Sequence, residues 1–327
     1  MKIMEILSLL VVLIVIMISL GCVNTPDNSV DSSIDVQIED STDTLIDDST
    51  DTLIDDSTDD SSGTMIGSEP ETITDSTSEN KISEDLTDLN SDNIIYSPLP
   101  GTSWQWQLSG TINTKYNVEM YDVDLVETPQ SIIDQLHQEG RKVICYFSAG
   151  SWEEFRDDAN DFPKSILGNT LEGWPDEKWL DVSNYNLFAN VMEERLDLAV
   201  EKGCDGVEPD NVDGYLNENG FDLNYQDQLE YNQWLTTEAH KRGLSIGLKN
   251  DLDQIDDLVD YFDFAVNEQC FEYDECEMLV PFIEHGKAVF GVEYELEPEN
   301  FCEEANQMDF SWLKMEYDLD GGRIGCS

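Results

Sequence analysis

Acidic side chains gather in one short stretch of the chain, CDGVEPDNVDGY at residues 204–215. Gly206 and Val207 are typical of a buried strand, and that strand pattern runs directly into Glu208 and Asp210. A buried carboxyl is costly to ionise, so such a cluster is either solvated in a loop or kept for chemistry. On an extended strand, residues two apart face the same side. Glu208 and Asp210 are therefore candidates for one shared site.

Strand-like runs alternate with helix-like stretches over the C-terminal part of the chain. The predicted strands are residues 104–108, 118–125, 142–150, 206–211, 244–250, 264–269, 288–294 and 311–317. Amphipathic helical patterns at 131–140, 187–203 and 231–243 each end in glycine, as a helix C-cap does. Eight such strands predict an α/β fold, a (β/α)8 TIM barrel over residues 93–327. A doubly wound open sheet is disfavoured because no glycine-rich phosphate loop follows the first strand.

In a (β/α)8 barrel the carboxyl ends of the strands line the active site, and here those ends are polar. They supply Asp122, Asp124, Tyr146, Ser148, Glu208, Asp210, Asn211, Lys249, Asn250, Asn267, Glu268 and Glu293. A single acidic residue is more often part of a core ion pair, for example with Lys249. A ring of polar side chains from at least five strand ends instead favours a catalytic site.

The first 92 residues are predicted to lie outside the fold. Residues 1–22 have an apolar run from Ile6 to Leu20, which is typical of a signal peptide, and Gly21 precedes Cys22 as in a lipoprotein cleavage site. An ordinary secretory signal and an uncleaved anchor remain as alternatives to lipidation of Cys22. Residues 23–92 repeat DSTDTLID at 40–47 and 48–55 and predict a disordered Asp/Ser/Thr-rich tether.

The chain is strongly acidic, with a net charge of −56. The tether holds 21 acidic residues and one lysine, a net of −20, and residues 1–22 hold one charge of each sign, so −36 falls on residues 93–327. Nucleic acid is excluded as a partner because phosphate binding needs clustered Lys and Arg. A polycation fits the charge better, and simple solubility or salt adaptation is the alternative.

Six cysteines follow Cys22, an even number in a chain with an export signal. The spacing predicts disulfides between Cys270 and Cys276 and between Cys302 and Cys326. Cys145 and Cys204 are expected to be buried, and the spacing leaves open whether they pair. The three histidines, His137, His240 and His285, each stand near the end of a helix-like stretch. A His-based catalytic triad or a His-ligated metal is therefore disfavoured, and no cofactor or metal is predicted.

Several motifs in order resemble glycoside hydrolase family 114, the endo-α-1,4-polygalactosaminidase family, which has a (β/α)8 barrel. They are WQWQLSG, VICYFSAGSWE, GCDGVEPDNVDGY, GLKND, NEQC and WLKM, from about Trp104 to the C-terminus. The resemblance implies hydrolysis of α-1,4-linked galactosamine polymers, or of a related amino sugar, with Asp210 and Glu268 as the catalytic acids. Such hydrolysis needs one protonated carboxyl and a second carboxylate across the sugar. We assign Asp210 as nucleophile or base and Glu268 as acid, an assignment that is open to exchange.

The remaining polar and aromatic residues are predicted to bind substrate. They are Asp122, Asp124, Tyr146, Glu208, Asn211, Lys249, Asn250, Glu293, Trp104 and Tyr215. Trp106, Trp152 and Tyr294 are further candidates to stack on a sugar, although Trp104 and Trp106 fit the bottom of the barrel equally well.

Two alternatives from other functional classes remain at this point. One is a metal-dependent phosphodiesterase with Asp122, Asp124, Glu208, Asp210 and Asp213 as ligands. The other is a tethered polysaccharide-binding barrel without catalysis. The predicted partners are a cationic or partly N-acetylated polysaccharide and, through the N-terminal anchor, the membrane. The chain is expected to be an extracellular monomer tethered to the outer face of the cell membrane.

Overall fold

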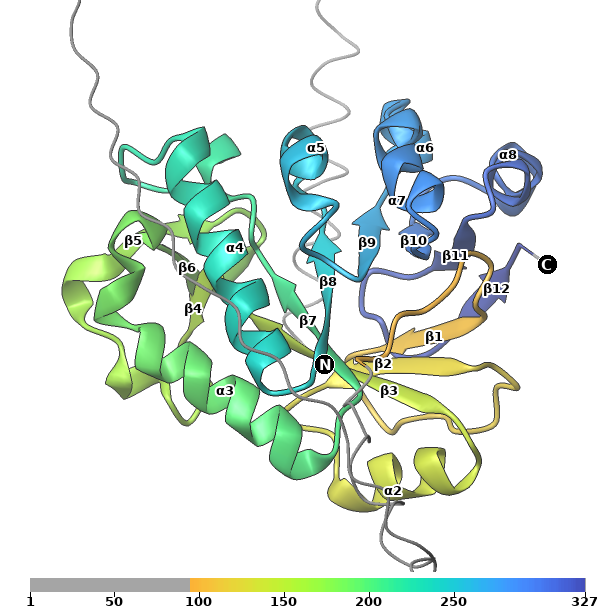
Figure 1. The fold of residues 1–327 in the computed structure, drawn as a ribbon, viewed down its shortest axis with the longest axis horizontal. Helices are drawn as coiled ribbons and strands as arrows, with labels where there is room; N and C mark the ends of the chain where they lie inside the picture. The colour runs from red at the N-terminus through yellow and green to blue at the C-terminus, as the bar shows by residue number, and fades with distance from the viewer. Residues whose placement is uncertain (1–94, 327) are drawn as a thin grey trace, which may run out of the picture. The chain divides into compact units, whose positions relative to one another are not determined.

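The computed structural model describes residues 95–326 (Figure 1). The predicted signal peptide at 1–22, with Cys22, and the predicted tether at 23–92 lie outside the described residues. Within the described range, none of the helices combines the length and the apolar character needed to cross a membrane.

Eight parallel strands form the core of the domain and confirm the predicted (β/α)8 barrel. They are β1 (Trp104–Gln107), β2 (Met120–Asp124), β3 (Lys142–Ser148), β7 (Gly206–Asp210), β8 (Ser245–Lys249), β9 (Phe264–Glu268), β10 (Val289–Glu293) and β11 (Ser311–Met315). Their order in the curled sheet is their order in the chain. Every predicted strand overlaps one of them, with boundaries that differ by two residues at most.

The barrel has a seam between its first and last strands. In the described residues, β1 and β11 share no strand pairing, and the antiparallel strand β12 (Arg323–Gly325) pairs with β11 instead. Side chains bridge the seam: the Trp104 indole donates to the Ser311 carbonyl at 2.9 Å, and Gln105 donates to the Gly321 carbonyl at 3.1 Å. The segment after β11 therefore closes the barrel.

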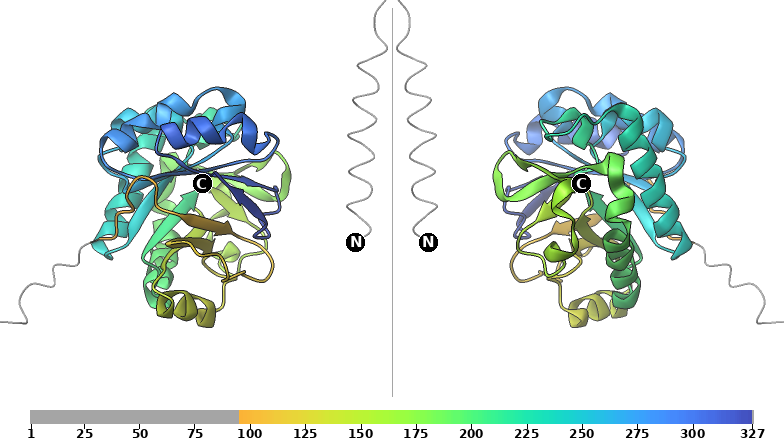
Figure 2. Two further views of the ribbon diagram at one scale, coloured as in Figure 1. Left: turned by 90° about the vertical axis from the view of Figure 1, so that its right-hand side faces the viewer. Right: turned by 90° about the vertical axis from the view of Figure 1, so that its left-hand side faces the viewer.

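The helices lie outside the strands, as Figures 1 and 2 show. They are α2 (Gln130–Gln138), α3 (Ala189–Lys202), α4 (Tyr225–Lys241), α5 (Ile255–Leu258), α6 (Cys270–Tyr273), α7 (Val280–Glu284) and α8 (Cys302–Gln307). The pattern at 231–243 misses the start of α4, where Asn224 and Asp227 form a capping box. The predicted glycine ends are confirmed, since Gly140, Gly203 and Gly243 all have positive φ.

An insertion between β3 and α3 forms a small second sheet that was not predicted. Strands β4 (Ser151–Glu153), β5 (Leu167–Leu171) and β6 (Trp174–Leu180) pair antiparallel, in the order β4-β6-β5. Arg156, from this insertion, forms a buried ion-pair network with Asp124 of β2 and Glu153 of β4. The network therefore ties the insertion to the barrel.

The lower interior of the barrel is an aromatic plug. Trp104 packs on Phe290 at 4.9 Å between ring centroids, and Trp106 stacks on Trp104 at 6.0 Å. Gly247 makes room for this plug, because a Cβ there would lie 2.3 Å from the Phe264 ring. Apolar rings thus fill the barrel below the level of Glu208 and Lys249.

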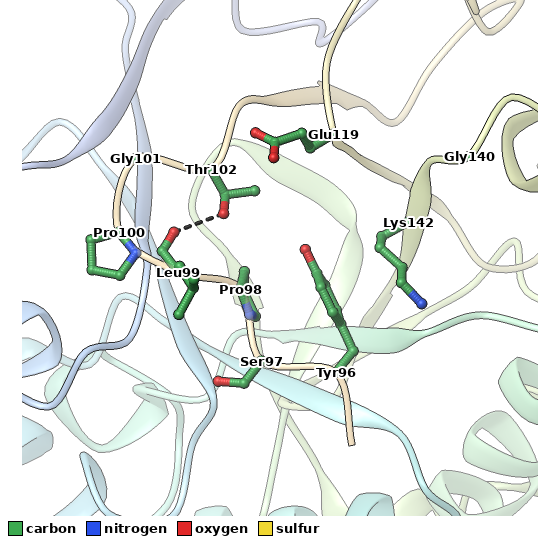
Figure 3. Close-up of a pocket in the computed structure, with 10 residues that line it drawn as sticks. All are labelled: Tyr96, Ser97, Pro98, Leu99, Pro100, Gly101, Thr102, Glu119, Gly140 and Lys142. Carbon is green, nitrogen blue, oxygen red and sulfur yellow. Dashed lines mark hydrogen bonds between the residues drawn. The ribbon is translucent and has the colours of Figure 1, made fainter. Parts of the chain in front are cut away.

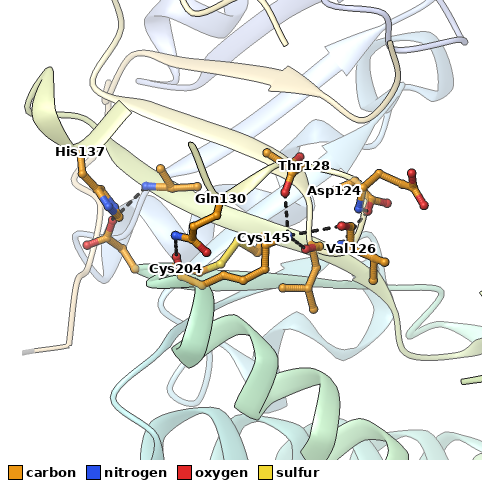
Figure 4. Close-up of a disulfide and its surroundings, with 12 residues drawn as sticks. Asp124, Val126, Thr128, Gln130, His137, Cys145 and Cys204 are labelled. Atoms are coloured by element: carbon orange, nitrogen blue, oxygen red, sulfur yellow. Dashed lines mark hydrogen bonds and ion pairs between the residues drawn. A yellow bond between two sulfur atoms is a disulfide. The ribbon is translucent and has the colours of Figure 1, made fainter. Parts of the chain in front are cut away.

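Three disulfides staple the domain. Cys270–Cys276 and Cys302–Cys326 are bonded as predicted, and the question left open by the sequence is resolved by a third bond, Cys145–Cys204. Figure 4 shows this third bond beneath the loop at Asp124–Gln130; it links β3 to the chain just before β7. The bond therefore fixes the two strands that present Tyr146 and Asp210.

Candidate active site

A single buried ammonium group joins three carboxylates at the carboxyl ends of the strands. Lys249 Nζ lies 3.1 Å from Glu208 Oε1, 3.1 Å from Asp210 Oδ1 and 3.5 Å from Glu268 Oε2. The Lys249 side chain is almost fully buried, and its ammonium sits 4.7 Å from the centre of the Trp106 ring. Strands β7, β8 and β9 therefore bring four of the predicted site residues together.

Asp210 is held by donors on both of its oxygens. Oδ1 accepts from the backbone N–H of Asn211 at 2.8 Å and from Lys249, while Oδ2 accepts from the Tyr146 hydroxyl at 3.1 Å. Gly150 permits this geometry, because a Cβ there would lie 1.6 Å from the Asn211 carbonyl oxygen. Donors of this kind favour the ionised form of a carboxyl.

Glu268 has fewer strong donors and more contact with solvent. Oε1 accepts from the Tyr294 hydroxyl at 2.5 Å, and Oε2 accepts from the Asn250 amide at 3.4 Å. The Asn250 carbonyl oxygen in turn accepts from the Glu268 backbone N–H at 3.0 Å. Asn250 has a positive φ of 50°, a conformation that asparagine tolerates better than most residues. Asn250 therefore orients Glu268 from the neighbouring strand.

Glu208 and Asp122 form a second, fully buried layer beneath this pair. The indole N–H of Trp106 donates to Glu208 Oε2 at 3.1 Å. Burial raises the pKa of Asp122 well above its usual range, and the neighbouring Glu208 raises it further, while a hydrogen bond joins the two carboxyls. Two ionised carboxylates in contact inside the barrel would repel each other strongly. Burial and the neighbouring Glu208 therefore both favour the protonated form of Asp122.

The charges around Lys249 keep it protonated. Burial by itself lowers the pKa of an ammonium, but the three carboxylates of Asp210, Glu208 and Glu268 outweigh it, and the pKa of Lys249 is raised. Burial also raises the pKa of Glu208 to about 7, against the attraction of Lys249. Beside this cluster, the charge of Asp210 contributes to raising the pKa of Glu177 and of Asp213 after burial. The mouth of the barrel is therefore predominantly negative.

Four residues predicted to bind substrate lie away from this cluster. Asp124 is bound by Arg156 through both oxygens at 3.1 and 2.7 Å. Glu293 faces the helical layer, where it accepts from the Phe271 backbone and the Trp312 indole. Trp104 lies in the plug, and Tyr215 packs edge-on against Tyr225.

The other predicted residues surround the carboxylates or lie close to them. Tyr146 and Asn250 contact Asp210 and Glu268 directly, and Asn211 donates from its side chain to Ser148 at 3.0 Å. Asp122 contacts Glu208 from below. Sequence reasoning did not single out Glu177, which accepts from Ser151 at 2.7 Å. No local pattern marks Glu177, because it lies in the unpredicted insertion.

Cavities elsewhere in the domain do not contain these carboxylates. A cavity of about 510 Å³ lies at the opposite end of the barrel, between residues 96–102 and the starts of β2 and β3. Figure 3 shows the residues that line it. The cavity has Tyr96, Glu119 and Lys142 in its lining. A second cavity of about 420 Å³ lies along the seam. In residues 95–326, no three His, Cys, Asp or Glu side chains are grouped to hold a metal ion, and Asp124 is separated from the other acids of the phosphodiesterase hypothesis by its pairing with Arg156.

Comparisons with known proteins identify the family and the fold. A family model described as glycoside-hydrolase family GH114 matches residues 87–327. The structure of Aspergillus fumigatus Ega3 in complex with galactosamine is similar, with 41% identity over 71% of this chain and 97% of that chain and a TM-score of 0.68. The glycoside hydrolase domain of PelA from Pseudomonas aeruginosa shares the fold at 12% identity, with 68% and 96% coverage and a TM-score of 0.56. A search of curated proteins finds no significant match.

The buried carboxyls predict a domain that is more stable in mild acid than in mild base. Burial raises the pKa of Glu153 and Glu208 to about 7, of Asp213 to about 6 and of Asp251 to about 8, from ordinary values of 4.5 for Glu and 3.8 for Asp. The native state then holds more protons than the unfolded state between about pH 4 and pH 8. The contribution of these four carboxyls to the free energy of unfolding is therefore fully present below about pH 4 and is lost as pH rises from about 4 to 8.

Guanidinium unfolding at pH 5 and at pH 8, with disulfides intact, measures this difference. We expect a lower free energy of unfolding at pH 8. The variant Asp251→Asn is the matched control, because asparagine tolerates the positive φ of 43° there and removes one of the titrating groups. Its stability should depend less on pH. An unfolding free energy that increases from pH 5 to pH 8 would contradict the assignment.

Proposed function

The chain belongs to glycoside-hydrolase family GH114 and is a glycoside hydrolase, and on that premise we propose that it cleaves internal bonds of α-1,4-linked galactosamine polymers. The observation that most supports this substrate is the 41% identity to a protein whose structure holds galactosamine. The negative mouth of the barrel supports it further, since each galactosamine unit with a free amine carries a positive charge.

Asp210 and Glu268 are the proposed catalytic pair. Donors on both oxygens hold the Asp210 carboxyl in place for the role of nucleophile or base. Glu268, with only the tyrosine hydroxyl at short range, takes the role of general acid that protonates the leaving oxygen. Lys249 pairs with both carboxyls and holds them side by side, and Glu208 pairs with Lys249 from below.

The geometry is compatible with retention of configuration, which is the stereochemical outcome of the proposed mechanism. The nearest oxygens of Asp210 and Glu268 lie 3.1 Å and 3.5 Å from the same Lys249 nitrogen, so they cannot be more than 6.6 Å apart. Retaining glycosidases space their carboxyls by roughly 5 to 5.5 Å, and inverting ones by roughly 6.5 to 9.5 Å. Asp210 would then attack the anomeric carbon and form a glycosyl-enzyme ester, while Glu268 gives its proton to the departing sugar. Water, deprotonated by Glu268, then releases the sugar from Asp210.

An extracellular location, with the chain tethered to the outer face of the cell membrane, completes the proposal. Three disulfides in the described domain support an oxidising compartment. The apolar run before Cys22 and the acidic tether support export and lipid attachment. Membrane fractionation of the wild type and of Cys22→Ser tests the anchor: the variant should leave the membrane fraction or remain unprocessed. Identical fractionation and mobility would remove the lipid anchor from the proposal.

The substrate prediction is that polygalactosamine with free amines is cut faster than its fully N-acetylated form. The net charge of −36 on residues 93–327 attracts ammonium groups, and salt screens that attraction over about 10 Å at 0.1 M. Product mass spectrometry, with NMR of the first-formed reducing end, measures cleavage and configuration. We expect new α reducing ends and a preference that weakens with salt. Equal cleavage rates on both polymers at low salt would mean that the negative charge of the domain serves solubility. Binding of the polymer without new reducing ends would remove the catalytic proposal.

The catalytic pair predicts a non-additive set of variants. Asp210→Asn and Glu268→Gln keep the size of the side chains but cannot ionise, so each should lower kcat by several orders of magnitude in a folded domain. The double variant should be little worse than either single one, because the two groups act as a unit.

Glu208→Gln is the matched control on the same strand. Because Glu208 contacts Lys249 and not the solvent, this variant should lose activity only in part and change the pH profile. Activity close to wild type in a folded Asp210→Asn, together with an inactive Glu208→Gln, would show that the nucleophile is the other carboxyl. Unfolding of all three variants would favour a structural ion network.

A further inference from the structure

An exposed tyrosine stands beside the catalytic pair without a role in the chemistry above. Tyr317 is 56% exposed, and its ring stacks on Tyr294 with centroids 4.3 Å apart and an angle of 24° between the planes. The Tyr294 hydroxyl donates to Glu268. One ring therefore separates Tyr317 from the proposed acid.

The stacking on Tyr294 places Tyr317 at the mouth of the barrel. On β11 the interior side chains are Leu313 and Met315, and the next position of that period is 317. On β10, Phe290 and Val292 lead in the same way to Tyr294. The two tyrosines thus lie just past the carboxyl ends of the neighbouring strands β10 and β11.

Charged and aromatic neighbours give this surface the chemistry of an amino-sugar site. The side chains of Glu272, Tyr273 and Glu295 lie near enough to raise the pKa of Tyr317, after burial, and all three are exposed. Tyr273 is 62% exposed, at the end of α6. An aromatic face attracts the C–H face of a pyranose and an ammonium group, and a carboxylate attracts the ammonium more strongly. Isolated exposed aromatics are common, but a stacked pair next to a catalytic carboxyl is not accounted for by folding.

We propose that Tyr317, supported by Tyr294 and flanked by Glu272 and Glu295, is a sugar-binding subsite for a galactosamine unit of the polymer beyond the bond that is cleaved. The inference rests on the proposed function. Around the barrel, β7 is followed by β8, β9, β10 and β11. Because Tyr294 and Tyr317 follow β10 and β11, the subsite lies past Glu268 on the side away from Asp210. It would hold a long chain across the mouth and contribute little to short substrates that do not reach it.

The test compares Tyr317→Ala, Tyr317→Phe and Tyr261→Ala in the full chain. Tyr261 is a matched control: it is 42% exposed and precedes β9, at the opposite end of the barrel. On polygalactosamine with free amines, Tyr317→Ala should raise KM about five- to tenfold with kcat nearly unchanged, the size expected for loss of one stacking contact. Tyr317→Phe keeps the ring and should match the wild type, as should Tyr261→Ala. The KM increase should shrink on di- and trisaccharides.

Three outcomes would overturn the subsite. They are an unchanged KM in Tyr317→Ala, an equal increase in Tyr261→Ala, and a fall in kcat at unchanged KM, which would mean that Tyr317 only supports Tyr294. If the wild type does not cut polygalactosamine, calorimetric binding in the Asp210→Asn background separates the two proposals. Polygalactosamine and partly deacetylated chitosan are the probes. Binding of either that weakens in Tyr317→Ala keeps the subsite while the substrate changes, and the absence of binding to both rejects it.

Discussion

The arrangement of the site depends on one buried positive charge. Lys249 is the common partner of Glu208, Asp210 and Glu268, which come from two strands on either side of its own. Three carboxylates this close would repel one another in a medium of low dielectric constant, and the ammonium between them offsets that repulsion. A neutral residue at position 249 would leave the carboxyls to take up protons instead, which would remove the nucleophile. The charge of Lys249 therefore holds the two proposed catalytic carboxyls, Asp210 and Glu268, side by side.

The apolar plug strengthens the interaction of the Lys249 ammonium with the carboxylates, because it keeps water away from them. Trp104 and Trp106 fill the barrel beneath the ammonium and exclude water from below. Trp106 also donates its indole N–H to Glu208, so one side chain both closes the interior and satisfies a buried carboxylate. Asp122 completes the layer as a proton holder, which lets two carboxyls occupy adjacent buried positions with one negative charge. The same burial that strengthens the electrostatics raises the pKa of the buried carboxyls, and the stability of the domain is therefore linked to pH.

The two sides of the site differ in their contacts: on one side, contacts hold the strands in place, and on the other, an exposed aromatic residue is proposed to bind substrate. The disulfide Cys145–Cys204 and the Arg156 network hold β2, β3, β7 and the insertion in place. On the other side of the mouth, the exposed Tyr317 stacks on the buried Tyr294, whose hydroxyl donates to Glu268. An endo-acting enzyme has to bind a long chain on both sides of the cleaved bond, and the proposed subsite at Tyr317 would provide one such contact beyond Glu268.

Local sequence patterns determined the eight barrel strands, the glycine ends of the helices and the four charged residues at the strand ends, because period and polarity are properties of neighbouring residues. Tertiary structure alone decided which polar strand ends share a site. Asp124 is bound by Arg156, which comes from an insertion without a strong strand pattern, and Glu293 faces outward because its strand continues its interior face through Tyr294. The pairing of Cys145 with Cys204, 59 residues apart, follows from the adjacency of β3 and β7. Such contacts depend on how the barrel closes. Closure depends on weak preferences spread over the whole chain, so no short segment of sequence predicts it.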